Sequence, residues 1–206
     1  MMTKTEIVID IGCLYDKQHS LDAFINCVKA EKISNLTSED IFEKKIVALL
    51  TEIGEFINEH RGFKYWSDKP KPETKIVVND NCEKCNGTGF VHAPEGNINC
   101  HCLNEVFIMH EEFADTLHFM LSLGNSLGYY VPYIQFTPNK KSLEQLMIDW
   151  FHSVTIFNYD SSIQNFKKML VCFGLVANYI GLTDKDICDL YNKKHEINIE
   201  RQKEGY

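Results

Sequence analysis

Two pairs of acidic residues at helical spacing are the strongest chemical signal in the sequence. Glu52 and Glu55 form one pair, and Glu112 and Asp115 form the other, on either side of a cysteine-rich segment. Residues three positions apart share one face of a helix, so each pair can direct two carboxylates toward one point. Two like charges about 4 Å apart repel by roughly 4 kcal/mol at an effective dielectric constant of about 20. If the two helices pack together, their carboxylates therefore need cations.

Oxygen ligands with open coordination positions favour Mg²⁺, which usually completes its shell with water and substrate phosphates. The acidic pairs thus indicate metal-assisted chemistry on a phosphorylated substrate, with one carboxylate able to orient or deprotonate the attacking water. Neighbouring Glu59 and Glu111 are alternative ligands. The competing interpretation is two solvated helix faces, and spacing alone does not separate it from a metal site.

Two further segments carry groups suited to a nucleotide. Lys194, Asn198 and Arg201 fall on one helical stripe, where an ammonium, an amide and a guanidinium suit a polyphosphate. Trp66 and Lys69 follow the first acidic helix, where the ring can stack on a base and the ammonium can reach phosphate. A solvated terminal helix and a tryptophan packed beneath a loop are the respective alternatives.

A cysteine-rich segment separates the two acidic pairs. Cys82 and Cys85 form a CxxC pattern followed by glycines, and Cys100 and Cys102 form a second pair. Four thiolates suit tetrahedral Zn²⁺, and a closed site of this kind is structural and not catalytic. We therefore expect a zinc-stapled insert over residues 73–104, because a segment this small cannot build its own core.

Other interpretations of the cysteines stay open. Since CxC is less usual than CxxC, His92 or His101 can replace one thiolate ligand. Four reduced cysteines in a loop and a thiol–disulfide switch are further alternatives. We expect the scattered cysteines to be buried free thiols of a reducing, cytoplasmic compartment; they are Cys13, Cys27, Cys172 and Cys188.

Helical patterns must position these groups. Apolar residues recur at helical period from near Lys17, again after Thr37, and from about Asn104 to Leu127. Gly181 suits the end of the penultimate helix. Four sequences typical of capping boxes also predict helix starts: Thr37–Asp40, Ser142–Gln145, Ser161–Gln164 and Thr183–Asp186.

Strand signals are weak by comparison. Lys75–Val78 and Gly89–His92 can form a short hairpin inside the insert. The length suits one domain over residues 1–206. The patterns together predict an all-α helical bundle with one interruption.

Composition excludes two classes of partner. The net charge of −8 argues against a protein that coats nucleic acid, because counterion release needs basic patches. It leaves a nucleotide substrate possible, since metal and a few cations can hold phosphate. The longest apolar stretch, residues 169–182, is too short to cross a bilayer, and no signal peptide is visible. We expect neither a membrane nor a nucleic-acid partner.

Three segments in this order resemble the dimeric dUTPases of the all-α NTP pyrophosphatase superfamily. They are LLTEIGEFINEHRGFKYWSDKP, EEFADTLHFMLSLG and YNKKHEINIERQKEGY, and the last contains the pattern KxxxNxxRQxxGY. The resemblance covers nearly the whole chain apart from the cysteine insert. It implies a mostly helical homodimer that hydrolyses dUTP to dUMP and pyrophosphate using Mg²⁺.

The resemblance also implies roles for individual residues. The acidic pairs match metal-binding ExxE and ExxD motifs, and we expect Glu52, in preference to Glu55, to position a water that attacks the β-phosphorus. Gln18 matches a glutamine that contacts the nucleoside. The family's phosphate-binding stripe corresponds to Lys194, Asn198 and Arg201, and the tyrosine that closes this motif corresponds to Tyr206. The family's loop near the base and the phosphates corresponds to Trp66 and Lys69.

Two rival functions stay open. A related pyrophosphatase acting on dCTP or on several deoxynucleoside triphosphates would carry the same acidic set, because the metals contact phosphates and not bases. A non-enzymatic, zinc-bearing interaction module is the rival from another class, although it has no use for clustered carboxylates. The few cations of the insert, Lys75 and Lys84, make nucleic acid a poor partner for such a module.

Overall fold

Helices form the body of the protein, as the sequence patterns predict. The computed structural model describes residues 5–77 and 82–205. The helices in these ranges are α1 (Gly12–Val28), α2 (Ala30–Ile33), α3 (Ser38–His60), α4 (Ile108–Ser126), α5 (Leu143–Tyr159), α6 (Ile163–Tyr179) and α7 (Asp184–Lys203). The predicted all-α bundle is therefore confirmed.

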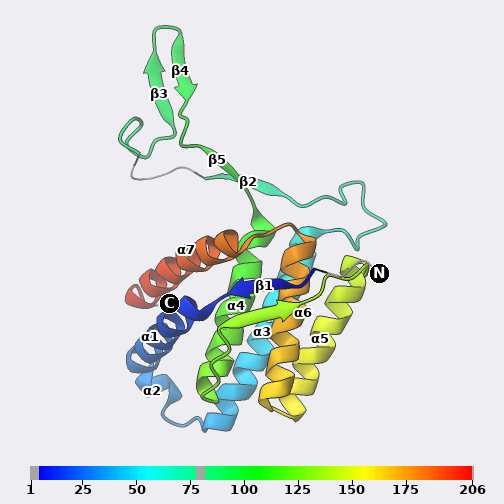
Figure 1. Ribbon diagram of the computed structural model, residues 1–206. Helices are drawn as coiled ribbons and strands as arrows, with labels where there is room; N and C mark the ends of the chain where they lie inside the picture. Colours follow the sequence, from blue (N-terminus) through cyan, green and yellow to red (C-terminus); the bar gives the residue numbers. More distant parts are fainter. Residues whose placement is uncertain (1–4, 78–81, 206) are drawn as a thin grey trace.

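An aromatic cluster joins four of the helices. Phe113 of α4 lies 4.4 Å from Phe173 of α6 in a stacked arrangement, 5.2 Å from Phe56 of α3 and 5.9 Å from Trp150 of α5, measured between ring centroids. All four side chains are buried. Helix α3 packs along α4, α5 packs along α6, and α1 and α7 lie against the remaining flank of α4 (Figure 1).

Local sequence determines where most helices begin. Three predicted capping boxes form, at Thr37, Ser142 and Thr183. In each, the hydroxyl accepts from the backbone N–H three residues later, and the side chain of that later residue accepts from the backbone N–H of the first. The box predicted at Ser161–Gln164 does not form. Helix α6 begins after Ser162 instead, and both the backbone N–H and the hydroxyl of Ser162 donate to the Asp160 carboxylate.

A two-stranded sheet that the sequence analysis did not predict lies across the bundle. Strand β1 (Ile7–Asp10) pairs antiparallel with β6 (Tyr133–Phe136). The first helix also starts at Gly12 and not near Lys17, because the Asp10 carboxylate accepts from the Gly12 backbone N–H and turns the chain directly into α1.

An arm projects from the bundle between α3 and α4 (Figure 1). Its base is β2 (Thr74–Val77) paired with β5 (Asn104–Phe107), and its tip is β3 (Phe90–Ala93) paired with β4 (Gly96–Asn99). The two strands predicted within the insert exist, but they do not pair with each other. Val78, the predicted end of the first strand, lies outside the described residues.

The pairing of β2 with β5 also corrects one helix boundary. The helix predicted from about Asn104 begins at Ile108, because residues 104–107 are held in the ladder with β2. The Ile108 backbone N–H then donates to the Glu73 carbonyl at 3.1 Å, where the ladder ends. Helix α4 is thus a direct continuation of an arm strand.

The four scattered cysteines are free thiols, but none of them is buried as expected. No disulfide joins any of the eight cysteines, all of which lie in the described part of the chain. Cys13 and Cys27 are exposed, and Cys172 and Cys188 are half-buried.

No helix in the described part of the chain is by itself long and apolar enough to cross a membrane. Helices α6 and α7 meet the criterion only when taken together, and they are bent by 107° at the break between them.

The close contact between α6 and β6 predicts that adding a methyl group at Gly174 destabilises the protein. A Cβ on Gly174 would lie 2.6 Å from Cε1 of Phe136 and 3.1 Å from Cγ2 of Ile134, so we expect Gly174→Ala to lower the free energy of unfolding by about 1–3 kcal/mol. Gly54→Ala is the matched control, since no described atom lies within 4 Å of the Cβ it would gain. That variant should gain roughly 0.5–1 kcal/mol. Urea unfolding measures both, and equal effects would contradict the packing argument.

Candidate active site

Apolar packing between α3 and α4 brings three of the predicted metal ligands together. Phe56 and Phe113 are in contact in the core, and each follows a glutamate in the sequence. Carboxylate oxygens of Glu52, Glu55 and Glu112 consequently lie within 4.8 Å of one another. The two helices therefore direct their acidic side chains to one point, as the spacing predicts.

The fourth predicted ligand is held by a cation. Asp115 accepts a 2.5 Å ion pair from Lys194 of α7, and both side chains are largely buried. This contact joins the predicted metal set to the predicted phosphate stripe. A metal ion bound to the Asp115 carboxylate would compete with Lys194 for it, so we expect metal binding there to loosen the pair. Until then the ammonium offsets part of the repulsion among the carboxylates.

The electrostatics of the cluster favour protonation. Burial, followed by repulsion from Asp115, Glu55 and Glu112, raises the pKa of Glu52 to about 7, although Lys194 opposes the shift. Burial also raises the pKa of Glu112 and of Asp115, against the lowering effect of Lys194. Carboxyls that hold protons this readily lie where a cation would be favourable.

A pocket of about 350 Å³ opens beside the carboxylates. Its wall includes Gln18 of α1, Glu52 of α3, Asp115 of α4, and Asn198 and Arg201 of α7. The volume falls within the range of about 300–1,000 Å³ that is typical of ligand sites. Five residues predicted from separate segments thus share one cavity, which brings two acidic groups together with Asn198 and Arg201 of the phosphate stripe.

Gln18 is fixed in orientation by its neighbours. Its Oε1 accepts from the Tyr191 hydroxyl at 2.8 Å and lies 2.8 Å from Nδ1 of His118, while its Nε2 donates to Asp22 at 2.8 Å. The pKa of His118 is lowered to about 3 by burial and by the nearby charge of His195, so the ring is neutral. Nδ1 must then carry the proton that Oε1 receives. The amide nitrogen of Gln18 therefore faces Asp22, which also lines the pocket.

Sequence reasoning missed several residues of this pocket. Asp22 and His118 both line it, and Ser122 donates to Asp22 at 2.9 Å. Helical spacing could have found two of them, since Asp22 lies four residues after Gln18 and His118 lies three after Asp115. No sequence signal links Tyr191 to Gln18, because their contact depends on the packing of α7 against α1.

Other predicted residues lie apart from the pocket. Trp66 is 66% exposed and contacts the rings of Phe63 and Tyr65. The Lys69 carbonyl accepts from Arg61 at 2.9 Å, in the same loop. The roles of Trp66 and Lys69 stay predictions. Tyr206 lies outside the described residues.

The two alternative acidic ligands also lie outside the carboxylate cluster. Glu111 pairs with Lys75 of β2 and with Lys193 of α7, at 3.8 Å for the latter. Glu59 accepts from the amide of Asn58 at 3.2 Å. Glu111 therefore contacts the arm and α7, and Glu59 contacts a neighbouring residue of its own helix.

The predicted zinc ligands come together in the arm. Thiol sulfurs of the four cysteines lie within 4.8 Å of one another and all four residues are buried; they are Cys82, Cys85, Cys100 and Cys102. Neither His92 nor His101 belongs to this group, although Nδ1 of His101 lies 3.4 Å from the Cys100 sulfur.

The carboxylate cluster fits Mg²⁺ by its chemistry and its dimensions. Mg²⁺ binds oxygen at about 2.0–2.1 Å in an octahedron, so opposite ligand oxygens lie about 4.1 Å apart. Glu52, Glu55 and Glu112 offer only oxygen, and their oxygens are within 4.8 Å of one another. Small side-chain movements would close them around an ion.

One family comparison covers most of the chain. A family model described as dUTPase matches residues 10–82 and 104–206. The matched segments include every residue of the carboxylate cluster and of the pocket wall, and they leave out residues 83–103 of the arm. The comparison with curated proteins found no match.

The raised pKa of Glu52 predicts how pH affects stability. The folded protein keeps the Glu52 proton to a higher pH than the unfolded chain does, so the metal-free protein loses stability as the pH rises from the unfolded pKa to about 7. Glu52→Gln removes the charge and keeps the shape. With EDTA present, we expect this variant to be about 1 kcal/mol more stable than wild type above pH ~7, after a discount for solvent screening, and equal near pH ~4.

Urea unfolding across this pH range measures the difference. Glu43→Gln is the control, because Glu43 lies on the exposed face of the same helix. It should match wild type at every pH. A Glu52→Gln protein no more stable than wild type above neutrality would show that burial and neighbouring charge do not destabilise the ionised Glu52.

Proposed function

The chain belongs to the dUTPase family, which makes it a nucleotide hydrolase of the dUTP pyrophosphatase type, and from this premise we propose that it hydrolyses dUTP to dUMP and pyrophosphate with bound Mg²⁺. One observation carries the proposal. Three carboxylates from two helices meet beside a pocket whose wall also contains the amide of Gln18 and, from α7, Asn198 and Arg201. A deoxynucleoside triphosphate needs these three kinds of group in this proximity.

Glu52, Glu55 and Glu112 would hold the metal, with Asp115 joining them once Lys194 leaves it. Bound Mg²⁺ would neutralise the charge that shields the phosphoanhydride and lower the pKa of bound water. Glu52 suits the role of the general base because it is the one glutamate of the cluster that lines the pocket. Glu55 is exposed and does not line the pocket.

The proposed reaction is a displacement at phosphorus. Glu52 takes a proton from water as the water oxygen bonds to the β-phosphorus. The bond from that phosphorus to the oxygen bridging it to the α-phosphate breaks, and dUMP leaves. Arg201 and the released Lys194 would stabilise charge on the transferred phosphates, with Asn198 orienting them.

The fixed amide of Gln18 supports uracil over cytosine. An amide nitrogen carries two hydrogens, and Asp22 receives one from Gln18. The second can be donated to the C4 carbonyl oxygen of uracil. Cytosine carries an exocyclic amine at C4, which is itself a donor, so two N–H groups would face each other with no acceptor between them. Since Tyr191 and His118 both donate to Oε1, rotation of the amide to suit cytosine would break two hydrogen bonds.

The homodimer implied by the family resemblance and the cytoplasmic location indicated by the cysteines stay predictions. Val47 on α3 and Ile148 on α5 are 62% and 68% exposed, and the two helices are in contact. Exposed aliphatic side chains of this kind are compatible with a face covered by a second subunit.

Pyrophosphate release from a panel of deoxynucleoside and ribonucleoside triphosphates tests the activity. We expect Mg²⁺-dependent release with the highest kcat/KM for dUTP. Glu55→Ala should lose at least ~100-fold, since even residues that only support metal ligands contribute about 10–100-fold. Glu43→Ala, on the exposed face of the same helix, should keep wild-type activity. Preference for dCTP would overturn the substrate assignment. Absence of Mg²⁺-dependent pyrophosphate release from every nucleotide tested would refute the proposed enzymatic activity.

Base discrimination is tested through Tyr191, which acts on Gln18. Tyr191→Phe removes one donor to Oε1 and should cost about 1 kcal/mol of stability. It should also lower the ratio of kcat/KM for dUTP to that for dCTP about fivefold, the equivalent of ~1 kcal/mol. Tyr159→Phe, at an 85% exposed position, should change neither quantity. Lost stability with an unchanged ratio would assign Tyr191 a purely structural role.

A further inference from the structure

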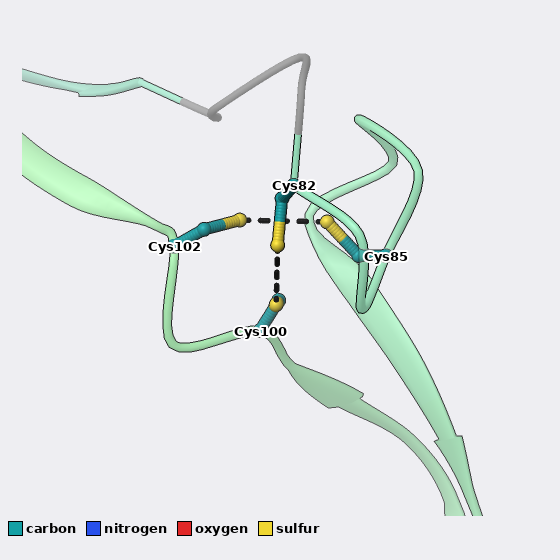
Figure 2. Close-up of side chains that lie close together, drawn as sticks. All are labelled: Cys82, Cys85, Cys100 and Cys102. Atoms are coloured by element: carbon teal, nitrogen blue, oxygen red, sulfur yellow. Dashed lines mark hydrogen bonds between the residues drawn. The ribbon is translucent and has the colours of Figure 1, made fainter.

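The buried cysteines of the arm are the one chemical cluster of the described chain that the proposed hydrolysis does not use. Their sulfurs point toward one another from two loops, one after β2 and one before β5 (Figure 2). The Cys82 and Cys100 sulfurs lie 3.7 Å apart, and those of Cys85 and Cys102 lie 3.4 Å apart.

These separations match a tetrahedral metal site. Zn²⁺ binds thiolate sulfur at about 2.3 Å, so two sulfurs on a regular tetrahedron lie about 3.8 Å apart. The two measured distances, 3.7 and 3.4 Å, approach that value. A disulfide would need about 2.05 Å. All four donors are protein sulfurs, which leaves no coordination position for a substrate.

The loop that carries Cys82 and Cys85 has the backbone of a metal knuckle. The Cys85 backbone N–H donates to the Cys82 carbonyl at 3.3 Å, which closes a turn between the two thiols. Asn86, Gly87 and Gly89 then adopt positive φ angles of 48°, 76° and 76°. Glycine tolerates this region without the steric cost of a side chain.

Apolar packing does not explain why these thiols are buried. In the described residues 82–103, the buried side chains are the four cysteines, and Val91 is the apolar residue packed against them. Phe90 and Ile98 in the same arm are 51% and 52% exposed. A segment held by the hydrophobic effect would bury these larger side chains first. A segment too small for a core needs a metal or disulfides instead.

We propose that Cys82, Cys85, Cys100 and Cys102 bind one Zn²⁺ ion in a closed structural site that holds the arm together at the end of its base ladder. The site closes the β2–β5 ladder at its outer end, since Cys82 follows β2 and Cys102 precedes β5. His101 contacts a ligand sulfur without entering the thiol cluster. The site lies outside the matched family segments except for Cys82, so it is a property of this chain's arm.

The zinc site also supports the start of α4. Strand β5 runs directly into that helix, and Lys75 of β2 pairs with Glu111 in its first turn. At the other side of the base, Arg61 at the end of α3 pairs with Glu73 at 3.0 Å. A loosened ladder would therefore release contacts at the ends of both acidic helices. The zinc itself takes no part in hydrolysis.

Metal content of the full-length protein, purified under reducing conditions, tests the site directly. Native mass spectrometry and elemental analysis should find one zinc per chain. Replacement by Co²⁺ should give the visible spectrum of a tetrahedral tetrathiolate. Cys85→Ser should weaken zinc binding by at least about 100-fold. Cys27→Ser, which alters an exposed cysteine of the bundle, should keep one zinc per chain.

Hydrogen exchange of the wild-type protein separates the proposal from a folding defect in the variant. Chelation should accelerate amide exchange about tenfold or more in the arm and at the start of α4, and leave α5 and α6 unchanged. Reduced wild-type protein without stoichiometric metal, or Cys85→Ser with full zinc affinity, would overturn the site. A mass lower by four hydrogens would show that the four thiols form two disulfides, and this would contradict the zinc site. Unchanged exchange in the zinc-free arm would refute the structural role.

Discussion

Apolar packing of α3 against α4 determines where the acidic side chains of both helices lie. Phe56 and Phe113 bury their rings between these helices, and the glutamates beside them are brought together as a result. Apolar contact thus brings the carboxylates to a place where burial and mutual repulsion destabilise their charged forms. The raised pKa of Glu52 is the consequence. Burial of a Phe side chain contributes about 1.5–3 kcal/mol, which is comparable with the repulsion of one close carboxylate pair. The core can therefore hold a charge cluster that is unfavourable until a cation binds.

The surrounding helices complete this cluster in two different ways. Helix α7 supplies Lys194, whose ion pair with Asp115 compensates buried charge and places the phosphate stripe beside the carboxylates. The contact between α7 and α1 supplies Tyr191, which fixes the amide of Gln18 together with His118. One terminal helix therefore links charge compensation to the orientation of a recognition group. Both contacts are buried, so changes in α7 would reach both parts of the pocket.

The arm is organised by another kind of interaction. The bundle has a continuous apolar core, whereas the described arm buries little besides its thiols. Thiols that converge from two loops provide few dispersion contacts, but they can provide four strong bonds to one ion. The arm nevertheless shares backbone with the site, because β5 continues into α4. The two clusters are thus chemically distinct and mechanically adjacent.

Features that depend on neighbours along the chain could be predicted from the sequence. The structure contains the helical spacing of the acidic pairs, the capping boxes at Thr37, Ser142 and Thr183, and the CxxC turn, all of which are local. The pairing of distant segments follows from tertiary packing. It placed residues 104–107 in a strand, added β1 to β6, and brought Lys194 to Asp115 and Tyr191 to Gln18. These contacts join residues far apart in sequence, and their partners are selected by the packing of whole elements. Local patterns carry no information about that choice.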